Sequence, residues 1–211
     1  MSLYSTDEYE IIKIVSQFKN KCSCGYDEIP VHIMKSTITS IAGPICKIIN
    51  SSIKNGIFPD LLKIAKVCPI FKSGEPDLFS NFRPISVLPS FSKIFEKILF
   101  IRLLSYLETN KILSNTQYGF RKSHSTFMAI IDMYDKISNA IDNNMYSLGI
   151  FIDLSKAFDT IDHAILLQKL ELYGIRGVAL KLFHDYLLNR KQYVVYNDTS
   201  SNLSNIYCGV S

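Results

Sequence analysis

Asp153 is the residue whose position in this sequence most clearly predicts chemistry. It follows a short apolar run, Leu148 to Ile152, which predicts a core strand with one carboxylate at its end. An ionised carboxylate that is buried without a partner is costly, so we expect a metal ion, an arginine or a lysine beside it. The alternative is structural, because an aspartate here could simply cap the helix that follows.

A second candidate is Lys72, which follows the β-rich run 64–71. That run is interrupted by Pro69 and ends at a polar turn, Lys72-Ser73-Gly74-Glu75. The pattern predicts a hairpin that presents a lysine at its tip. A solvated surface charge is the alternative interpretation.

The cysteines and histidines give weaker signals. Five cysteines are scattered along the chain, which favours reduced thiols over a disulfide framework. Cys22 and Cys24 are separated by one residue and have neither a second pair nor nearby histidines, so no zinc site is expected there. For His163, which follows Asp162, we expect a structural hydrogen bond rather than a role in catalysis.

Composition permits several functions and excludes few. The 211 residues carry 23 Lys plus Arg against 19 Asp plus Glu, a mild positive charge that allows a polyanionic partner without requiring one. With 47% apolar residues the chain can build a core, as one domain or two small lobes. No apolar run approaches the roughly 20 residues of a membrane span, and no apolar signal core begins the sequence.

The pattern of apolar residues predicts an α+β fold that would position these groups. A helix is expected over Ile11 to Phe18, started by a capping box of Ser5 and Glu8. Further helices are expected up to Gly56, from Ser90, over 125–141, after Asp162 and through Leu187. A strand is expected at 64–71, and a hairpin is expected from 192–196 and 205–210.

Four sequence strings, in order, resemble one family. They are Lys72, the run Asn81 to Ser86 (NFRPIS), the run Gln117 to Arg121 (QYGFR) and the run Phe151 to His163 (FIDLSKAFDTIDH). This order and spacing resembles the reverse transcriptases of non-long-terminal-repeat retrotransposons, especially jockey-like elements. The resemblance spans nearly the whole chain. A group II intron maturase is a related alternative. It is favoured less, because the strings that precede Phe151 resemble the jockey type.

The resemblance implies a right-hand polymerase, an RNA-directed DNA polymerase that takes an RNA template, a DNA primer and deoxynucleoside triphosphates. Residues 1–145 would form the fingers region with an N-terminal helical extension, and residues 146–211 would form a partial palm. Asp153 and the backbone carbonyl of Leu154 would bind Mg²⁺, of which the complete parent enzyme holds two ions. Cytoplasmic ribonucleoprotein and the nucleus are the expected locations.

The resemblance also implies roles for six further residues. Lys72 and Arg83 would hold the triphosphate, because cations offset its charge and arginine can bind two phosphate oxygens at once. Phe158 would lie beneath the incoming sugar and exclude a 2′-hydroxyl, although spacing alone predicts a core phenylalanine. Phe120, Arg121 and Lys122 would follow the template backbone, with an ordinary surface loop as the alternative. Asp159 and Asp162 are expected to start a helix and form hydrogen bonds.

The sequence also departs from the family pattern. Gly209-Val210-Ser211 stands where a Gln-Gly loop would begin, before the Tyr/Phe-x-Asp-Asp hairpin and the thumb, and no Asp-Asp dipeptide occurs. Tyr196-Asn197-Asp198-Thr199 imitates that hairpin but lies too close to Asp153. We therefore expect the isolated chain to be inactive and prone to aggregation. The alternatives are a non-catalytic nucleic-acid-binding remnant and a partner-binding relic of the fingers.

Overall fold

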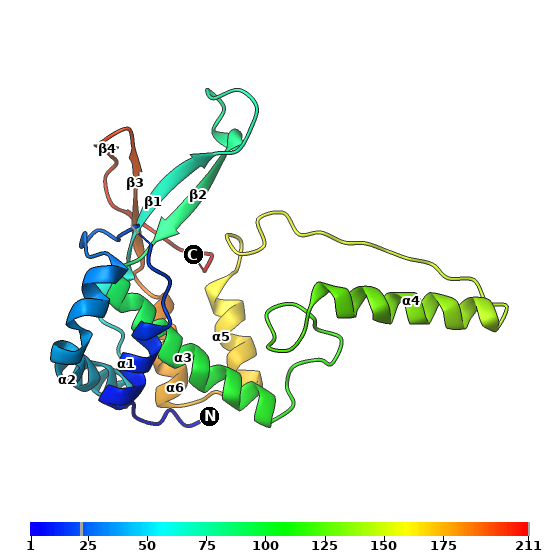
Figure 1. Ribbon diagram of the computed structural model, residues 1–211, viewed down its shortest axis with the longest axis horizontal. Coiled ribbons are helices and arrows are strands. Elements are labelled where there is room, and N and C mark those ends of the chain that lie inside the picture. Colours follow the sequence, from blue (N-terminus) through cyan, green and yellow to red (C-terminus); the bar gives the residue numbers. More distant parts are fainter. Residues whose placement is uncertain (22, 211) are drawn as a thin grey trace. The chain divides into compact units, whose positions relative to one another are not determined.

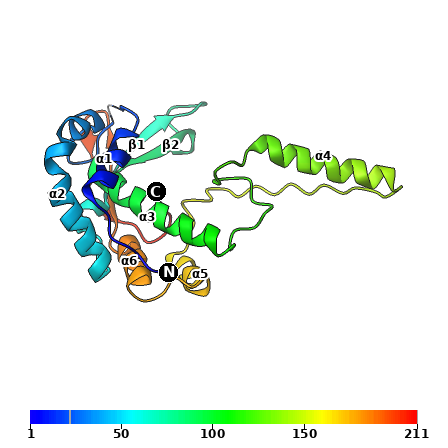
Figure 2. The same ribbon diagram turned by 60° about the horizontal axis from the view of Figure 1, so that its bottom comes forward.

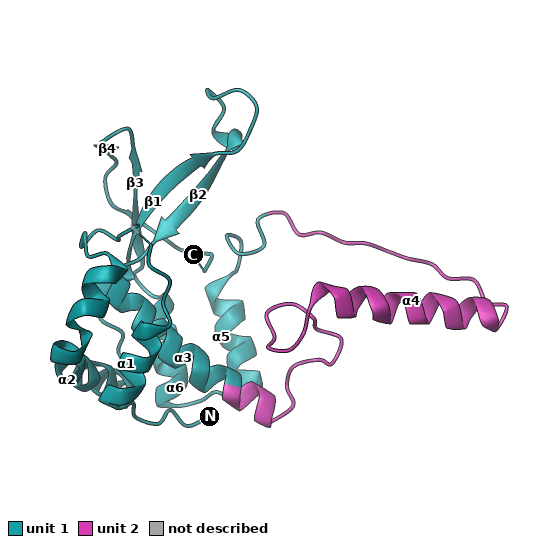
Figure 3. Ribbon diagram, viewed as in Figure 1, with its two compact units in different colours: residues 1–104, 156–211 teal, residues 105–155 magenta. Residues whose placement is uncertain are grey.

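The computed structural model describes residues 1–21 and 23–210, so the prediction about Cys22 and the terminal Ser211 lie outside it. The chain forms two compact units (Figure 3), the first from residues 1–104 and 156–211, the second from residues 105–155. These two units are defined by how compactly their residues pack. The predicted boundary at residue 145 instead separates fingers from palm, and it stays a prediction.

Five helices build most of the first unit: α1 (Glu8–Ser16), α2 (Val31–Asn55), α3 (Ser90–Thr109), α5 (His163–Leu172) and α6 (Val178–Leu187). The boundary between the units falls within α3. The predicted capping box is wrong, because Asp7 caps α1 by accepting the Glu10 N–H. The predicted end of α2 is confirmed, since Gly56 adopts the left-handed conformation there (φ 66°).

The core of the first unit lies where α1, α2, α3 and α6 gather at the base of the sheet (Figures 1 and 2). Phe58 is completely buried, with its ring centroid 4.7 Å from Phe95 and 4.9 Å from Tyr186. Nearby, the buried Lys63 ammonium pairs with Asp60 (2.9 Å) and Asp185 (3.0 Å). This satisfied charge fixes the segment that leads into the first strand.

The sheet combines antiparallel and parallel pairing. Its strands are β1 (Ile64–Phe71), β2 (Phe82–Val87), β3 (Lys191–Tyr196), β4 (Thr199–Ser200) and β5 (Ser204–Asn205), with one-turn 3₁₀ helices at Asp60–Lys63 and Phe79–Asn81. β2 pairs antiparallel with β1, and β3 pairs parallel with the other edge of β1. The predicted partner strand 205–210 is confirmed only at Asn205, where β5 pairs antiparallel with β3. Residues 206–210 do not continue this strand, and the short strand β4 also pairs with β3. The α+β prediction is confirmed as a mixed fold with a small sheet.

The second unit contains α4 (Thr126–Asp142), which the sequence predicts to within a residue. Ser125 caps α4 by accepting the Met128 N–H (3.3 Å), yet none of its residues is buried. Across residues 1–21 and 23–210, no helix has both the length and the apolar character needed to cross a membrane.

The predicted buried strand before Asp153 is wrong. Residues 145–154 form no regular structure, and the side chains of Leu148, Ile150 and Ile152 are 88%, 76% and 84% exposed. A strand needs neighbouring strands to satisfy its backbone and an apolar layer to cover its face. No strand of the described residues pairs with this run, so its apolar side chains remain in solvent.

Candidate nucleotide and nucleic-acid site

The β1–β2 hairpin carries two of the predicted site residues, Lys72 and Arg83. The Lys72 N–H donates to the Asn81 carbonyl (2.8 Å), which extends the ladder one pair beyond Phe71 and Phe82. Arg83 lies opposite Ile70. Because opposed residues share a face and successive residues alternate, Lys72 and Arg83 lie on the same face of the hairpin, one diagonal step apart.

The turn of the hairpin is closed by Gly74 and Asn81. Gly74 has φ +96°, and a Cβ atom there would lie 2.6 Å from the Asn81 side-chain nitrogen. That nitrogen donates to the Glu75 carbonyl (2.9 Å), so the close approach is part of the turn. Glycine at position 74 therefore allows the chain to turn shortly after Lys72, the residue that follows β1.

The opposite face of the hairpin is apolar. A hollow of about 420 Å³ is lined by Val67, Pro69, Phe82, Pro84, Val194 and Tyr196 from three strands, with Pro76 and Phe79 from the turn. The Phe82 ring packs edge-on against Phe71 (5.5 Å) and Tyr196 (5.9 Å). These aromatic contacts stiffen the hairpin. The two exposed cations, Lys72 and Arg83, lie on its other face. Neither pairs with an acidic side chain of the described residues.

Phe158 lies in the irregular segment before α5 and is 56% exposed, so the core alternative is not what the structure shows. The Phe158 carbonyl accepts the Val210 N–H (2.9 Å), and the Ile161 carbonyl accepts the Gly209 N–H (2.8 Å). A ring nitrogen of His163 is hydrogen-bonded to the Gly209 carbonyl (2.7 Å). The segment 206–210 thus holds the Phe158 turn in place, and the predicted structural role of His163 is confirmed.

Asp159 and Asp162 have different roles. Asp162 caps α5 by accepting the Ile165 N–H (3.0 Å), as predicted. Asp159 does not start a helix, because α5 begins four residues later; it lines a hollow of about 770 Å³ together with Ser86, Gln192 and Tyr207. Sequence reasoning missed this hollow, because the strands that form it lie far apart in the chain. Only the adjacency of Asp159 to Phe158 could have indicated it.

Asp153 and Leu154 lie in the second unit, in the exposed segment that follows α4. A carboxylate and a backbone carbonyl are suitable oxygen ligands for a divalent ion. However, no group of three or more His, Cys, Asp or Glu side chains comes together among residues 1–21 and 23–210. The donors present therefore do not fit a complete metal site, and the predicted ion would need ligands beyond Asp153 and Leu154.

Phe120, Arg121 and Lys122 lie in the loop that precedes α4. Phe120 is 86% exposed and Lys122 is also exposed. Arg121 is only partly exposed, and one end of its guanidinium donates to the Ser114 carbonyl (2.8 Å), while its Nε is buried without a hydrogen bond. Part of the arginine's donor capacity therefore holds its own loop together.

Asp132 of α4 contacts a residue in the middle of this loop. Its carboxylate pairs with Lys136 (2.7 Å) and is hydrogen-bonded to Tyr118, and these two contacts lower the pKa of Asp132, that from Lys136 most. Tyr118 belongs to the run Gln117 to Arg121, which also contains Phe120. The loop is thus tied to a helix whose own apolar side chains are in solvent.

The predicted site residues divide between the units. Lys72, Arg83 and Phe158 belong to the first, and the carboxylate at 153 belongs to the second with its neighbour Leu154 and the run 120–122. The first group has two exposed cations on the β1–β2 hairpin and an exposed ring on an anchored turn. Those groups can bind phosphate and an aromatic or sugar surface, whereas the second group lacks the ligands for metal chemistry of its own.

Several known proteins that are similar to this chain are described as RNA-directed DNA polymerases of mobile elements. The chain is 28% identical over 202 residues to the probable RNA-directed DNA polymerase from transposon X-element of Drosophila melanogaster, covering 95% of this chain and 22% of that protein. It is 31% identical over 163 residues to the corresponding probable enzyme from transposon BS of the same species, covering 77% and 18%. It is 36% identical over 123 residues to the RNA-directed DNA polymerase from mobile element jockey of Drosophila melanogaster, covering 58% of this chain and 13% of that protein.

The chain thus spans at most about a fifth of the length of these relatives. Residues 70–211 match the family model described as reverse transcriptase (RNA-dependent DNA polymerase). That stretch includes Lys72, Arg83, Asp153 and Phe158, the residues on which the resemblance of the sequence depends, and it covers about two thirds of the chain. The chain belongs to the reverse transcriptase family.

Proposed function

We propose that this chain supplies the fingers and the first part of the palm of a retrotransposon RNA-directed DNA polymerase. Residues 1–145 would form the fingers with their N-terminal helical extension, and residues 146–211 would enter the palm. The observation that supports this most is the family match over residues 70–211, which holds the candidate nucleotide-binding residues. The RNA template, DNA primer and deoxynucleoside triphosphates are the proposed partners.

The β1–β2 hairpin is the proposed triphosphate-binding element. Lys72 and Arg83 share a face, so both can approach one chain of phosphates, and the arginine can bind two oxygens at once. Phe158 is exposed on a turn that segment 206–210 holds in place. A ring held there would contact the sugar and discriminate against a 2′-hydroxyl.

Asp153 and the Leu154 carbonyl are the proposed first ligands for Mg²⁺ in the whole polymerase. Because the described residues gather no complete ligand set, residues 1–211 on their own are proposed to have no polymerase activity. Phe120, Arg121 and Lys122 are proposed to contact the template backbone and stack on a base. A polymerase of this kind would act in cytoplasmic ribonucleoprotein and in the nucleus.

A chimera tests this proposal. Residues 1–211 would replace the matching segment of the jockey polymerase, and RNA-templated primer extension would be measured. We expect the chimera to extend primers and Asp153→Asn to reduce extension to background. Asp135→Asn is the matched control, because Asp135 is an exposed aspartate of the same unit on α4. An active Asp153→Asn chimera would contradict the proposed role of Asp153.

The same chimera separates the nucleotide-binding residues. Lys72→Ala and Arg83→Ala should each lower the rate at limiting nucleotide by about 10-fold to 100-fold, since a charged donor to the triphosphate is lost. Lys19→Ala, at an exposed loop lysine, should change it little. Phe158→Ala should instead raise incorporation of ribonucleotides relative to deoxynucleotides. Equal effects of Lys72→Ala and Lys19→Ala would remove the hairpin from the site.

A further inference from the structure

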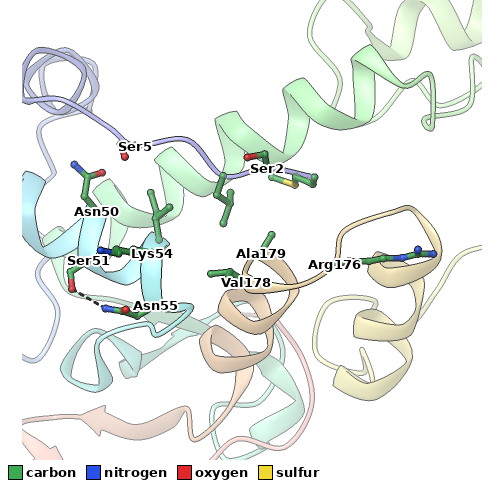
Figure 4. A pocket seen from close by; sticks show the side chains of 12 residues that line it. Ser2, Ser5, Asn50, Ser51, Lys54, Asn55, Arg176, Val178 and Ala179 are labelled. Atoms are coloured by element: carbon green, nitrogen blue, oxygen red, sulfur yellow. Dashed lines mark hydrogen bonds between the residues drawn. The ribbon is translucent and has the colours of Figure 1, made fainter.

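A groove of about 800 Å³ with a mixed polar and apolar lining is found in the first unit, away from every residue assigned above (Figure 4). Three segments that are distant in sequence form it: residues 1–5, the last turns of α2 and residues 176–179 at the start of α6. Its side chains include serine hydroxyls and asparagine amides. The lining also includes apolar side chains, so the charged groups decide which ligand fits; the apolar ones are Met1, Leu3, Ile53, Val178 and Ala179.

The groove carries uncompensated positive charge. Lys54 lies in the last turn of α2 and Arg176 in the turn between α5 and α6, and both are exposed. No acidic residue is found among the described residues that line the groove, and neither cation forms a described ion pair. Lys181 adds a third cation at the rim, where its ammonium donates to the Asn55 carbonyl (3.1 Å). Such a surface attracts anions.

The two lining cations lie toward opposite sides of the groove, with Ser2 and Ser5 on the segment that runs between them (Figure 4). A single small phosphate would be bound best by cations that converge on it. Separated cations with hydroxyl donors between them fit a polymer that presents several phosphates along its length. Phosphate oxygens of nucleic acids are commonly contacted by arginine, lysine and serine side chains.

The walls of the groove are fixed before any ligand binds. Asn50 of α2 accepts the Thr6 N–H and donates to the Thr6 carbonyl, both at 2.9 Å. At the other end, the Met1 nitrogen donates to the Gly174 carbonyl (2.9 Å), which ties the leading segment to the turn before Arg176. A preformed site loses less conformational entropy on binding than one that must order itself.

We propose that this groove binds the phosphate backbone of a nucleic-acid strand. Lys54 and Arg176 contact different phosphates, and the hydroxyls of Ser2 and Ser5 donate to phosphate oxygens between them. The inference rests on the proposed function, since a polymerase of this family handles nucleic acid, but it adds a contact surface distinct from Lys72, Arg83 and the run 120–122. An acidic peptide is the competing ligand that the test must exclude.

Fluorescence anisotropy with the whole 211-residue chain tests the groove. The probe is a labelled single-stranded RNA about 20 nucleotides long, titrated at several salt concentrations. We expect Lys54→Glu combined with Arg176→Glu to weaken binding by about tenfold or more. It should also reduce the slope of log affinity against log salt by about 1.4, since each phosphate contact to a single strand contributes about 0.7.

Lys13→Glu combined with Lys19→Glu is the matched control. Lys13 lies in the last turn of α1 as Lys54 does in α2, Lys19 is an exposed loop residue, and the change in net charge is identical. This control should weaken binding less than about threefold. Equal losses for the two double variants would overturn the inference, because net charge alone would then explain binding.

Three further measurements complete the test. Lys54→Gln with Arg176→Gln is a milder variant that should weaken binding in the same direction if the glutamate variant fails to fold. A polyglutamate competitor that displaces the RNA as well as unlabelled RNA does would overturn the assignment in favour of an acidic peptide. No RNA binding by the unmodified chain at low salt would also overturn it, whereas the chimera assay decides the polymerase proposal independently.

Discussion

The helical core of the first unit and the segment 143–155 of the second have similar apolar residues but opposite surroundings. Ile11, Ile98 and Leu182 are completely buried, whereas Phe151 and Ile152 are 85% and 84% exposed. The first set lies on helices that cover one another. The second set lies on a run without a pairing strand in the described part of the chain. Apolar composition thus predicts that a segment should be buried, but it does not identify which other segment buries it.

Helix α4 shows the same distinction within one element. Its apolar residues recur at helical spacing and Ser125 caps it, so local chemistry is sufficient to form the helix. Its apolar face is nevertheless in solvent. A helix satisfies its own backbone hydrogen bonds, whereas a strand cannot, which explains why α4 is regular and residues 145–154 are not.

The two regions should differ most in how much stability is lost when an aromatic side chain is replaced by alanine. Phe58→Ala should lower the free energy of unfolding of the first unit by about 3–5 kcal/mol, because it removes a buried ring packed between two others. Phe151→Ala should change it by less than about 0.5 kcal/mol. Urea unfolding followed by circular dichroism measures both. Comparable losses would mean that the segment around Phe151 is packed.

A smaller loss of folding stability is expected when the contact between Glu10 of α1 and Arg102 of α3 is weakened. Glu10 accepts from both nitrogens at the end of the buried Arg102 guanidinium, with Oε1 2.7 Å from Nη1, and the same guanidinium lies 3.7 Å from the Tyr4 ring centroid. Glu10→Gln should lower the free energy of unfolding by about 2 kcal/mol at pH 7, since charge-assisted hydrogen bonds are lost.

That contact also predicts a pH dependence. The hydrogen bond from Arg102 is the largest contribution to the lowered pKa of Glu10. A carboxyl with a lowered pKa in the folded state stabilises the fold above its unfolded-state pKa of about 4.3, and this contribution is lost as the pH falls. The difference between Glu10→Gln and the unmodified chain should therefore shrink below about pH 4. A difference that persists at pH 2 would contradict this electrostatic account.

The smallest effect on stability, but a clear one on solubility, is expected from the exposed run. Replacing Leu148, Ile150 and Ile152 with threonine should leave the unfolding midpoint of the first unit nearly unchanged. It should raise the concentration at which the chain remains monomeric, because exposed apolar runs promote association. Light scattering checks this. Unchanged aggregation would show that this run is not the cause.

The sequence predicted most of what depends on neighbouring residues. The cap at Asp162, the helix end at Gly56, the strand at 64–71 and the helix after Ser125 all follow from local rules. The failures involve distant partners. The strand before Asp153 was expected because its residues are β-branched, aromatic and apolar, but pairing depends on other strands. The hollow beside Asp159 depends on four strands and the segment after β5 meeting in space.

For the candidate site, the sequence could nominate residues but could not predict how they are arranged. The resemblance named Lys72 and Arg83, and only the register of β1 and β2 places them on one face. The groove between residues 1–5, α2 and α6 carries no motif, because its three segments are separated by more than forty residues at each step. No pattern within a window of the sequence could have found it.

Amide hydrogen exchange tests the central contrast most directly, because it reads the two regions in one sample. We expect strong protection for the backbone of β1, β3 and α2, and exchange close to the unprotected rate for residues 145–154. Protection of residues 145–154 in the isolated chain would contradict the account. It would show that the segment carrying Asp153 is already part of a paired and covered structure.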